Sequence, residues 1–271
     1  MRVVESSTVA KNGSPEGGED GIVLGADFAG VVDGATDKTG RRFAGVSGGR
    51  FVMLTLRDAA RDLPPGATAR EAVDRLTAAV AAALPDDLPE LDRPSAAMTL
   101  YSRTRREIWQ IGDVGFSFPG APAPQGQKKV DRVNVEMRAA VLRAELLGGA
   151  SPDDLAAEDP GRAAIMPLLT RQVRFANADP RQAGELAYGT LDGRRVPDGL
   201  IRVTTLPLGV HELIIGSDGY PELLGTLSES ERNLKILLAE DPLCIGGLAG
   251  TKGVAPGNES YDDRSYLRLE L

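Results

Sequence analysis

The sequence predicts an α+β fold with largely antiparallel sheets. Strand and helix patterns occur in blocks along the chain instead of in strict alternation, which is typical of antiparallel sheets and not of a doubly wound parallel sheet. Two strand pairs meet at short turns, one at residues 25–27 and one at the basic tip 103–106, as hairpins do. At 271 residues, the chain is long enough for one large domain or two small ones.

The first half of the chain contains most of the predicted strands. Apolar and β-branched runs predict strands over residues 2–9, 21–34 (two strands), 95–102 and 106–113. A helix is expected over 45–62, and Pro64 and Pro65 stop it. Thr68 and Glu71 form a T-x-x-E capping box. This box predicts a second helix, because apolar residues follow it at helical spacing.

The second half is less regular. Residues 131–149 read as an amphipathic helix closed by glycine, whereas residues 150–198 are weakly patterned, with many prolines and charges. An apolar strand then ends just before Asp218, and Ser228 with Glu231 repeats the capping-box pattern and predicts another helix. The alternating leucines of residues 265–271 predict a final, half-buried strand.

Composition excludes several function classes. The hydrophobic content of 42% suits an ordinary globular core, and no apolar run is long enough for a membrane span or a signal peptide. The net charge of −8 argues against a nucleic-acid partner. The single cysteine, Cys244, excludes an intrachain disulfide and suits a reducing environment, so we expect a cytoplasmic protein.

The residue counts also narrow the chemistry. With one histidine, His211, and one cysteine, no Cys/His zinc cluster can form, and His211 is expected to be structural because it lies in an apolar strand pattern. The segment GGLAGTKG lacks the Gly-Lys step of a phosphate-binding P-loop. Carboxylates are the abundant reactive groups, and without histidine they favour hard cations such as Mg²⁺ or Mn²⁺.

Two Asp-Gly steps differ from ordinary turns. The chain has five such steps, and those at Asp192 and Asp198 lie in polar surroundings, where turns are expected. Asp33 and Asp218 instead end apolar runs that should lie in the core. A strand end holds a side chain rigidly, as a metal ligand requires.

Further acids precede two of the predicted strands. Glu19 and Asp20 come just before the strand that pairs with the one ending at Asp33, and Asp262 with Asp263 comes just before the last strand. We therefore expect acids from four distant segments to cluster at one edge of the sheets. The alternative is that they are scattered surface acids, which are common.

The ordered motifs GED, VVDGATD, QIGDVGF, LIIGSDGYPELL and DDRSYLRLEL resemble those of the metal-dependent protein phosphatases, the PPM or type 2C Ser/Thr family, over residues 19–271. The resemblance implies a single domain with a four-layer α-β-β-α sandwich, in which two antiparallel sheets are flanked by helix pairs. It also implies a centre of two Mn²⁺ or Mg²⁺ ions, with a third possible, and a variable flap within about residues 120–200.

The resemblance assigns roles to individual residues. Asp33 would bridge both metals, and Asp33 and Asp218 would be the catalytic pair. Asp113 would match the acid of a looser third metal. The full set of implied metal ligands is Glu19, Asp20, Asp33, the Gly34 carbonyl, Asp113, Asp218 and Asp262.

The sequence also departs from the family pattern, as an outlying bacterial-type member would. Ala35 follows Asp33-Gly34 where many members have a histidine or methionine. The phosphate-gripping arginine before the first acids has no counterpart. Lys11 is the nearest cation, and Lys38, Arg41 or Arg42 could substitute. Lys252, in a Gly-rich loop, is expected to be a surface lysine.

Three functions remain open. The first is hydrolysis of phosphoserine or phosphothreonine in proteins by a hydroxide that bridges the two metals, a mechanism that the resemblance implies. The second is the same chemistry on a small phosphorylated metabolite, favoured by the missing arginine. The third is a phosphatase-like module that binds a partner without catalysis. Retention of the implied metal ligands favours the two enzymatic functions.

Overall fold

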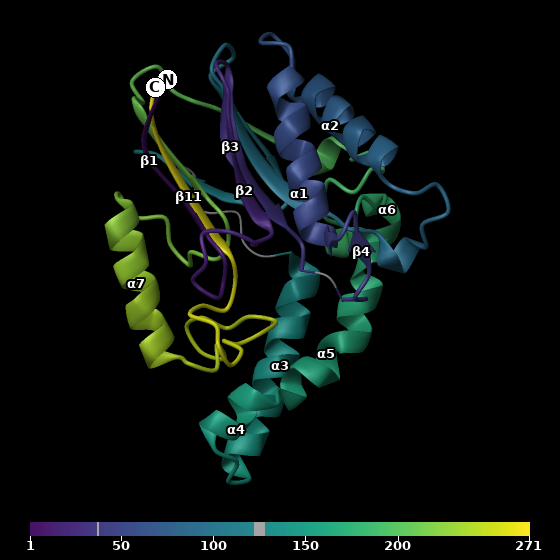
Figure 1. The fold of residues 1–271 in the computed structure, drawn as a ribbon, viewed down its shortest axis with the longest axis vertical. Coiled ribbons are helices and arrows are strands. Elements are labelled where there is room, and N and C mark those ends of the chain that lie inside the picture. The colour runs from purple at the N-terminus through teal and green to yellow at the C-terminus, as the bar shows by residue number, and fades with distance from the viewer. Residues whose placement is uncertain (37, 122–127) are drawn as a thin grey trace.

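The computed structural model describes residues 1–36, 38–121 and 128–271. Its main strands form two antiparallel sheets (Figure 1). The five-stranded sheet has the order β2 (Asp20–Leu24), β3 (Phe28–Gly34), β6 (Ala96–Ser102), β7 (Glu107–Ile111) and β9 (Arg202–Thr205). The four-stranded sheet has the order β1 (Arg2–Val9), β11 (Arg264–Glu270), β10 (Glu212–Gly216) and β8 (Gly115–Ser117).

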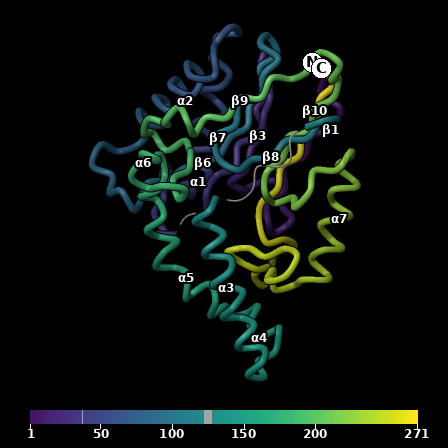
Figure 2. Tube along the Cα trace, turned by 180° about the vertical axis from the view of Figure 1, so that it is seen from behind, coloured from purple at the N-terminus to yellow at the C-terminus, as the bar shows by residue number. Residues whose placement is uncertain are grey.

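Helices surround this pair of sheets. The described helices are α1 (Gly48–Ala59), α2 (Ala69–Ala83), α3 (Lys129–Leu147), α4 (Pro152–Ala157), α5 (Pro160–Arg171), α6 (Pro180–Ala183) and α7 (Leu227–Glu240). A small hairpin, β4 (Arg42–Phe43) with β5 (Val46–Ser47), precedes α1. The chain ends lie side by side (Figure 2), because β1 pairs with β11 over its whole length.

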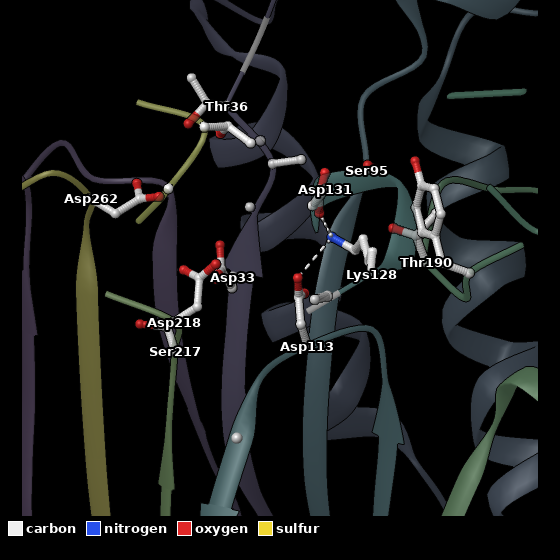
Figure 3. Close-up of a pocket in the computed structure, with 18 of the residues that line it drawn as sticks. Asp33, Thr36, Ser95, Asp113, Lys128, Asp131, Thr190, Ser217, Asp218 and Asp262 are labelled. Atoms are coloured by element: carbon white, nitrogen blue, oxygen red, sulfur yellow. Dashed lines mark ion pairs between the residues drawn. The ribbon is translucent and has the colours of Figure 1, made fainter. Parts of the chain in front are cut away.

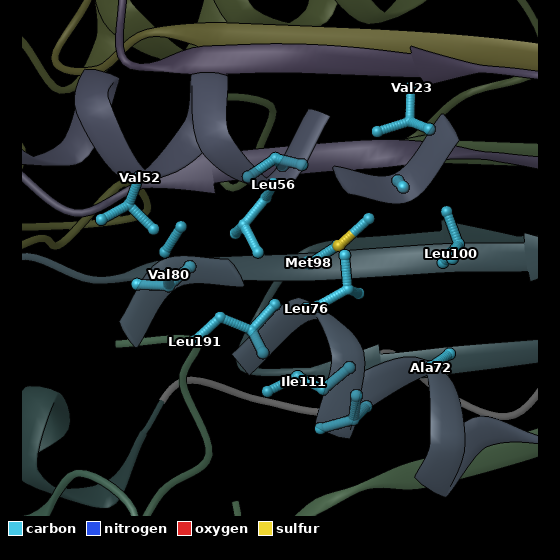
Figure 4. Packing of buried hydrophobic residues seen from close by; sticks show 14 of the residues in the cluster. Val23, Val52, Leu56, Ala72, Leu76, Val80, Met98, Leu100, Ile111 and Leu191 are labelled. Carbon is cyan, nitrogen blue, oxygen red and sulfur yellow. The ribbon is translucent and has the colours of Figure 1, made fainter. Parts of the chain in front are cut away.

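Three layers of buried side chains hold the sandwich together. The helices α1 and α2 cover the outer face of the five-stranded sheet, where Leu56 and Leu76 meet Met98 (Figure 4). Between the sheets, side chains such as Val31 pack with Leu267. On the far side, α7 covers the four-stranded sheet. Burial of both sheet faces explains the nearly continuous apolar run of β3, and the predicted four-layer α-β-β-α sandwich is confirmed.

The flanking helices differ from the implied helix pairs. In the described part of the chain, α7 alone covers the four-stranded sheet, whereas α3 packs against α5. With α4, these two helices project beyond one end of the sandwich (Figures 1 and 2). Leu142 of α3 is therefore buried against Leu155 and Leu243, away from the sheets, while Val133, Met137 and Leu147 of the same helix are exposed.

Several element predictions need correction. The last helix begins at Leu227, and its N-cap is Thr226 and not Ser228, since the Thr226 side chain accepts the N–H of Glu229. Residues 150–198 contain α4, α5 and α6, each opened by an acidic or serine cap before a proline. These helices were not predicted, because their apolar residues show little helical periodicity. The helix predicted from residue 45 starts at Gly48, because residues 46–47 form β5.

Candidate active site

One pair of site carboxylates is set by strand pairing. Asp20 at the start of β2 stands directly opposite Asp33 near the end of β3, so both side chains lie on the same face of the sheet. Like charges directly opposite each other destabilise a sheet. Asp20 is also buried, and its Oδ2 has no hydrogen-bond partner among the described residues. Such a pair has no structural benefit and indicates a functional site.

The other sheet supplies Asp218 and Asp262. Asp218 follows the end of β10, which pairs with β11, and Asp262 lies just before β11. Gly219 makes this approach possible, because a Cβ there would lie 2.0 Å from the carbonyl oxygen of Asp263. The hydroxyl of Tyr261 donates to the Asp218 carbonyl at 2.9 Å. The glycine is needed for close packing and not, as in many turns, for a left-handed backbone.

These side chains open into a cavity of about 940 Å³. Asp33, Asp218 and Asp262 lie on one side of it, while Asp113 lies on the other (Figure 3). The cavity walls also contain cationic side chains, namely Lys38, Arg93, Lys128, Arg162, Arg202 and Lys252. The site is therefore a cavity with a cluster of carboxylates on one side and cationic side chains in its walls.

The carboxylates raise one another's affinity for protons. Burial raises the pKa of Asp33 well above its usual range, and the charges of Asp20 and Asp218 raise it further. The pKa of Asp20 is also raised well above its usual range by burial, with Asp262 and Asp218 adding to the shift. Buried like charges of this kind are stable as anions only beside a cation.

Glu19 and Gly34, two further implied ligands, make protein contacts. The Glu19 carboxylate accepts the Ser47 hydroxyl at 2.6 Å, just before α1. The Gly34 N–H donates to the Glu19 carbonyl at 3.1 Å, and a Cβ on Gly34 would lie 2.5 Å from the Gly49 carbonyl oxygen. Gly34 therefore allows three segments to meet, and it lines the cavity, while one Glu19 oxygen is engaged by serine.

Asp113 is neutralised by the protein itself. Its Oδ2 lies 2.9 Å from Lys128 Nζ, which is 4.0 Å from Asp131 Oδ2 (Figure 3). The Lys128 ammonium also lies 5.2 Å from the centre of the Tyr188 ring, a cation–π contact. Asp113 thus lies at the cavity as expected, but a lysine already holds it.

Lys252 is a site residue, so its assignment as a surface lysine is wrong. Its Nζ lies 2.7 Å from Asp262 Oδ2 and donates to Thr36 Oγ1 at 3.2 Å. Lys252 lines the cavity. The lysine in GGLAGTKG, ten residues before Asp262, was a weak signal for this contact. Lys128 and Arg162 were missed because nothing in their local sequence indicated a site.

The carboxylate oxygens at this site are ligands of the chemical type that hard cations bind. Asp20, Asp33, Asp218 and Asp262 supply anionic oxygens, which Mg²⁺ and Mn²⁺ prefer, and Asp20 Oδ2 lacks any hydrogen-bond partner within the described ranges. In the same ranges, no group of three or more acidic, histidine or cysteine side chains is arranged as a ready-made metal site. The fit is strongest for Asp20, Asp33 and Asp218, since Glu19, Asp113 and Asp262 have protein partners.

Of the two Asp-Gly steps assigned to turns, only one is a simple surface turn. Asp198 is exposed and pairs with Arg70 and Arg195. Asp192 is fully buried, and its Oδ2 accepts two hydrogen bonds from the Arg194 guanidinium at 2.6 and 2.8 Å. Asp192 is therefore a buried loop residue with polar partners and not an exposed turn residue, and it organises the protein interior.

Two remaining predictions concern regions outside the cavity. His211 is exposed just before β10 and does not line the cavity, and Cys244 is buried. Within residues 1–36, 38–121 and 128–271, no helix combines the length and apolar character needed to cross a membrane. Residues 122–127 and Asp37 of the VVDGATD motif lie outside the described residues.

Comparison with known proteins adds three solved structures. No protein-family model and no curated protein sequence matches the chain. It is similar to the Ser/Thr phosphatase PstP/Ppp of Mycobacterium tuberculosis, with 16% identity, a TM-score of 0.48 and coverage of 100% of this chain and 99% of that one. The chain is also similar to MsPP of Mycobacterium smegmatis, described as a PPM Ser-Thr phosphatase, with 14% identity, a TM-score of 0.47 and coverage of 100% of both chains. It is similar as well to Stp1 of Staphylococcus aureus, a Ser/Thr phosphatase, with 14% identity, a TM-score of 0.47 and coverage of 100% of this chain and 96% of that one.

Proposed function

We propose that this protein is a metal-dependent phosphomonoester hydrolase that removes phosphate from phosphoserine or phosphothreonine in proteins. The observation that carries the proposal is the facing pair Asp20–Asp33, joined at one cavity by Asp218 and Asp262. Four clustered carboxylates from both sheets need cations, and phosphoryl transfer is catalysed largely by positioning and electrostatic stabilisation.

Asp20, Asp33, Asp218 and Asp262 would hold two Mn²⁺ or Mg²⁺ ions. Bound there, such ions lower the pKa of water and neutralise charge on phosphoryl oxygens. The chain contributes a rigid frame, because each acid lies at or next to the end of a paired strand. Lys252 fixes Asp262 and adds a positive charge beside the acids.

The preference for protein substrates rests on the PPM-like motifs, and two observations support alternatives. The cationic walls of the cavity would suit a small, strongly anionic metabolite. The ion pairs Lys252–Asp262 and Lys128–Asp113 neutralise two acids without metal, as a non-catalytic binding module would require. Neither ion pair involves Asp20 or Asp33, and this favours catalysis.

Residues 129–171 are the proposed flap. They form α3, α4 and α5, lie within the predicted variable region of about 120–200, and project beyond the sandwich (Figure 1). Asp131 and Arg162 from α3 and α5 line the cavity, so substrate choice would be made there. We also propose that residues 1–271 act as one domain and that the protein works in the cytoplasm.

A phosphatase assay with matched substrates tests these functions. Purified protein is given p-nitrophenyl phosphate, a phosphothreonine peptide and a panel of sugar phosphates, with Mn²⁺ or with a chelator. The proposal predicts metal-dependent release of phosphate with the highest kcat/KM on the peptide. Higher kcat/KM on a sugar phosphate would favour the metabolite function, and no release from any substrate would favour the binding module.

A further inference from the structure

The walls of the cavity contain two cations that the proposed chemistry does not use. Lys252 and Lys128 each have a carboxylate partner. Arg93 and Arg202 donate to backbone carbonyls behind the cavity, those of Asp192 and Gly112. Lys38 and Arg162 remain, one from the loop after β3 and one from α5.

Lys38 has an ammonium group without a counter-ion in the described structure. Its Nζ donates to the Thr36 carbonyl at 3.1 Å, and no carboxylate of the described residues pairs with it. Burial lowers the pKa of Lys38 to about 8, the positive charges of Arg162, Lys128 and Lys252 contribute, and the Asp131 carboxylate opposes the shift. A partly buried cation that faces other cations is unfavourable unless an anion joins them.

A hydrogen bond holds the Arg162 side chain in place, and within the described residues its other N–H donors have no hydrogen-bond partner. Its Nη1 donates to the Thr251 carbonyl at 2.8 Å, next to Lys252. The nearest acid, Asp159, is engaged elsewhere: its Oδ1 accepts the Arg162 backbone N–H at 2.6 Å and its Oδ2 accepts Arg138 Nε at 2.8 Å. A guanidinium has five N–H donors, so Arg162 can still bind an anion in the cavity.

We propose that Lys38 and Arg162 form an oxyanion subsite that binds the phosphoryl group of the substrate in the same cavity as the carboxylates. This inference rests on the proposed function and deepens it, because it names the residues that replace the missing phosphate-gripping arginine. The chemistry of the subsite is that of a phosphate dianion, for which guanidinium and ammonium donors are the usual partners.

The first experiment uses p-nitrophenyl phosphate, whose only anionic group is the phosphoryl group. We compare the wild type with Lys38→Met and Arg162→Gln. Each variant should raise KM at least about tenfold, the effect of losing one charge-assisted hydrogen bond, and Lys38→Arg should restore most of it. Melting temperatures close to that of the wild type show that the variants are folded.

Two matched controls remove similar charges outside the cavity. Lys235→Met removes an exposed lysine on α7, and Arg61→Gln removes an exposed arginine that pairs with Asp58. Both should leave KM within about twofold of the wild type, as surface charges usually do. Unchanged KM in Lys38→Met and Arg162→Gln would overturn the inference. So would a KM increase confined to peptides with acidic residues beside the phosphoresidue, because the pair would then bind those residues.

A second experiment separates this inference from the proposed function. Inorganic phosphate is titrated into the wild type and the double variant by calorimetry in the presence of Mn²⁺. The wild type should bind phosphate at least about tenfold more tightly than the double variant. Equal affinities would overturn the subsite. If the wild type hydrolyses none of the tested substrates, the proposed function fails, while this titration still decides whether the subsite exists.

Discussion

Asp192-Gly193 and Asp218-Gly219 are the same dipeptide in two different environments. Asp192 is fully buried, and its carboxylate is matched by the Arg194 guanidinium and by Asn177 Nδ2 at 3.1 Å. Asp218 opens into the cavity, where burial in the site raises its pKa and the charges of Asp262 and Asp113 add to the shift. The partners of a buried acid, more than its burial, therefore distinguish a structural acid from a functional one.

Metal removal should give the largest effect. If the Asp218 end of the molecule holds Mn²⁺ or Mg²⁺, a chelator should abolish phosphate release, and excess Mn²⁺ should restore it. Hydrolysis is followed with p-nitrophenyl phosphate. Full activity in the presence of a chelator would show that Asp218 holds no catalytic metal. Asp218 could then not be distinguished from Asp192 as a functional acid.

Asp218→Asn should lower kcat/KM at least about a hundredfold, because it removes a charge that holds the cations. The metal-free variant should melt no lower than the metal-free wild type, since one of several crowded like charges is gone. Asp198→Asn is the matched control, because Asp198 is an exposed Asp-Gly residue. Its kcat/KM should stay within about twofold of the wild type. Equal, mild effects at both positions would show that Asp218 is only a turn residue.

Asp192→Asn should affect stability and not catalysis. Asn keeps the shape of the side chain but leaves the Arg194 guanidinium with only the more distant Glu90 carboxylate as a charged partner. The free energy of unfolding should fall by about 2 kcal/mol, measured by urea denaturation. The kcat of the folded variant should match the wild type at a temperature where both are folded. A large loss of kcat with unchanged stability would contradict the assignment of Asp192 to the interior.

Lys38 tests the same comparison for a cation. Its substitution should change the melting temperature, and this change should be the smallest of the expected effects. Its pKa is lowered from the usual 10.5 to about 8, so the folded state binds this proton less tightly than the unfolded state. The charge therefore destabilises the fold below about pH 8, and this penalty disappears as the pH rises towards 10.5. Lys38→Met should raise the melting temperature by a few degrees at pH 7, with a smaller difference near pH 10. A variant that melts lower than the wild type at pH 7 would show that Lys38 is already paired.

Much of the fold followed from local patterns. The periods of apolar residues predicted the strands β1, β2, β3, β6, β7, β10 and β11 and the helices α1, α2 and α3, because these elements bury one or both faces against long neighbours. The short strands β8 and β9 were not predicted. The helices α4 and α5 were not predicted. They pack mainly on α3 and on the 241–253 loop, so their sequences show little amphipathic pattern.

The sequence alone determined that carboxylates would end two core strands, since Asp33 and Asp218 follow apolar runs directly. Only the tertiary structure decided which charges face one another. Strand register set Asp20 opposite Asp33, and loop packing brought Lys252 to Asp262 and Lys128 to Asp113. It also left Lys38 and Arg162 facing the cavity. Local sequence fixes the period of an element, whereas contacts between loops depend on how distant elements pack, and no local pattern records that packing.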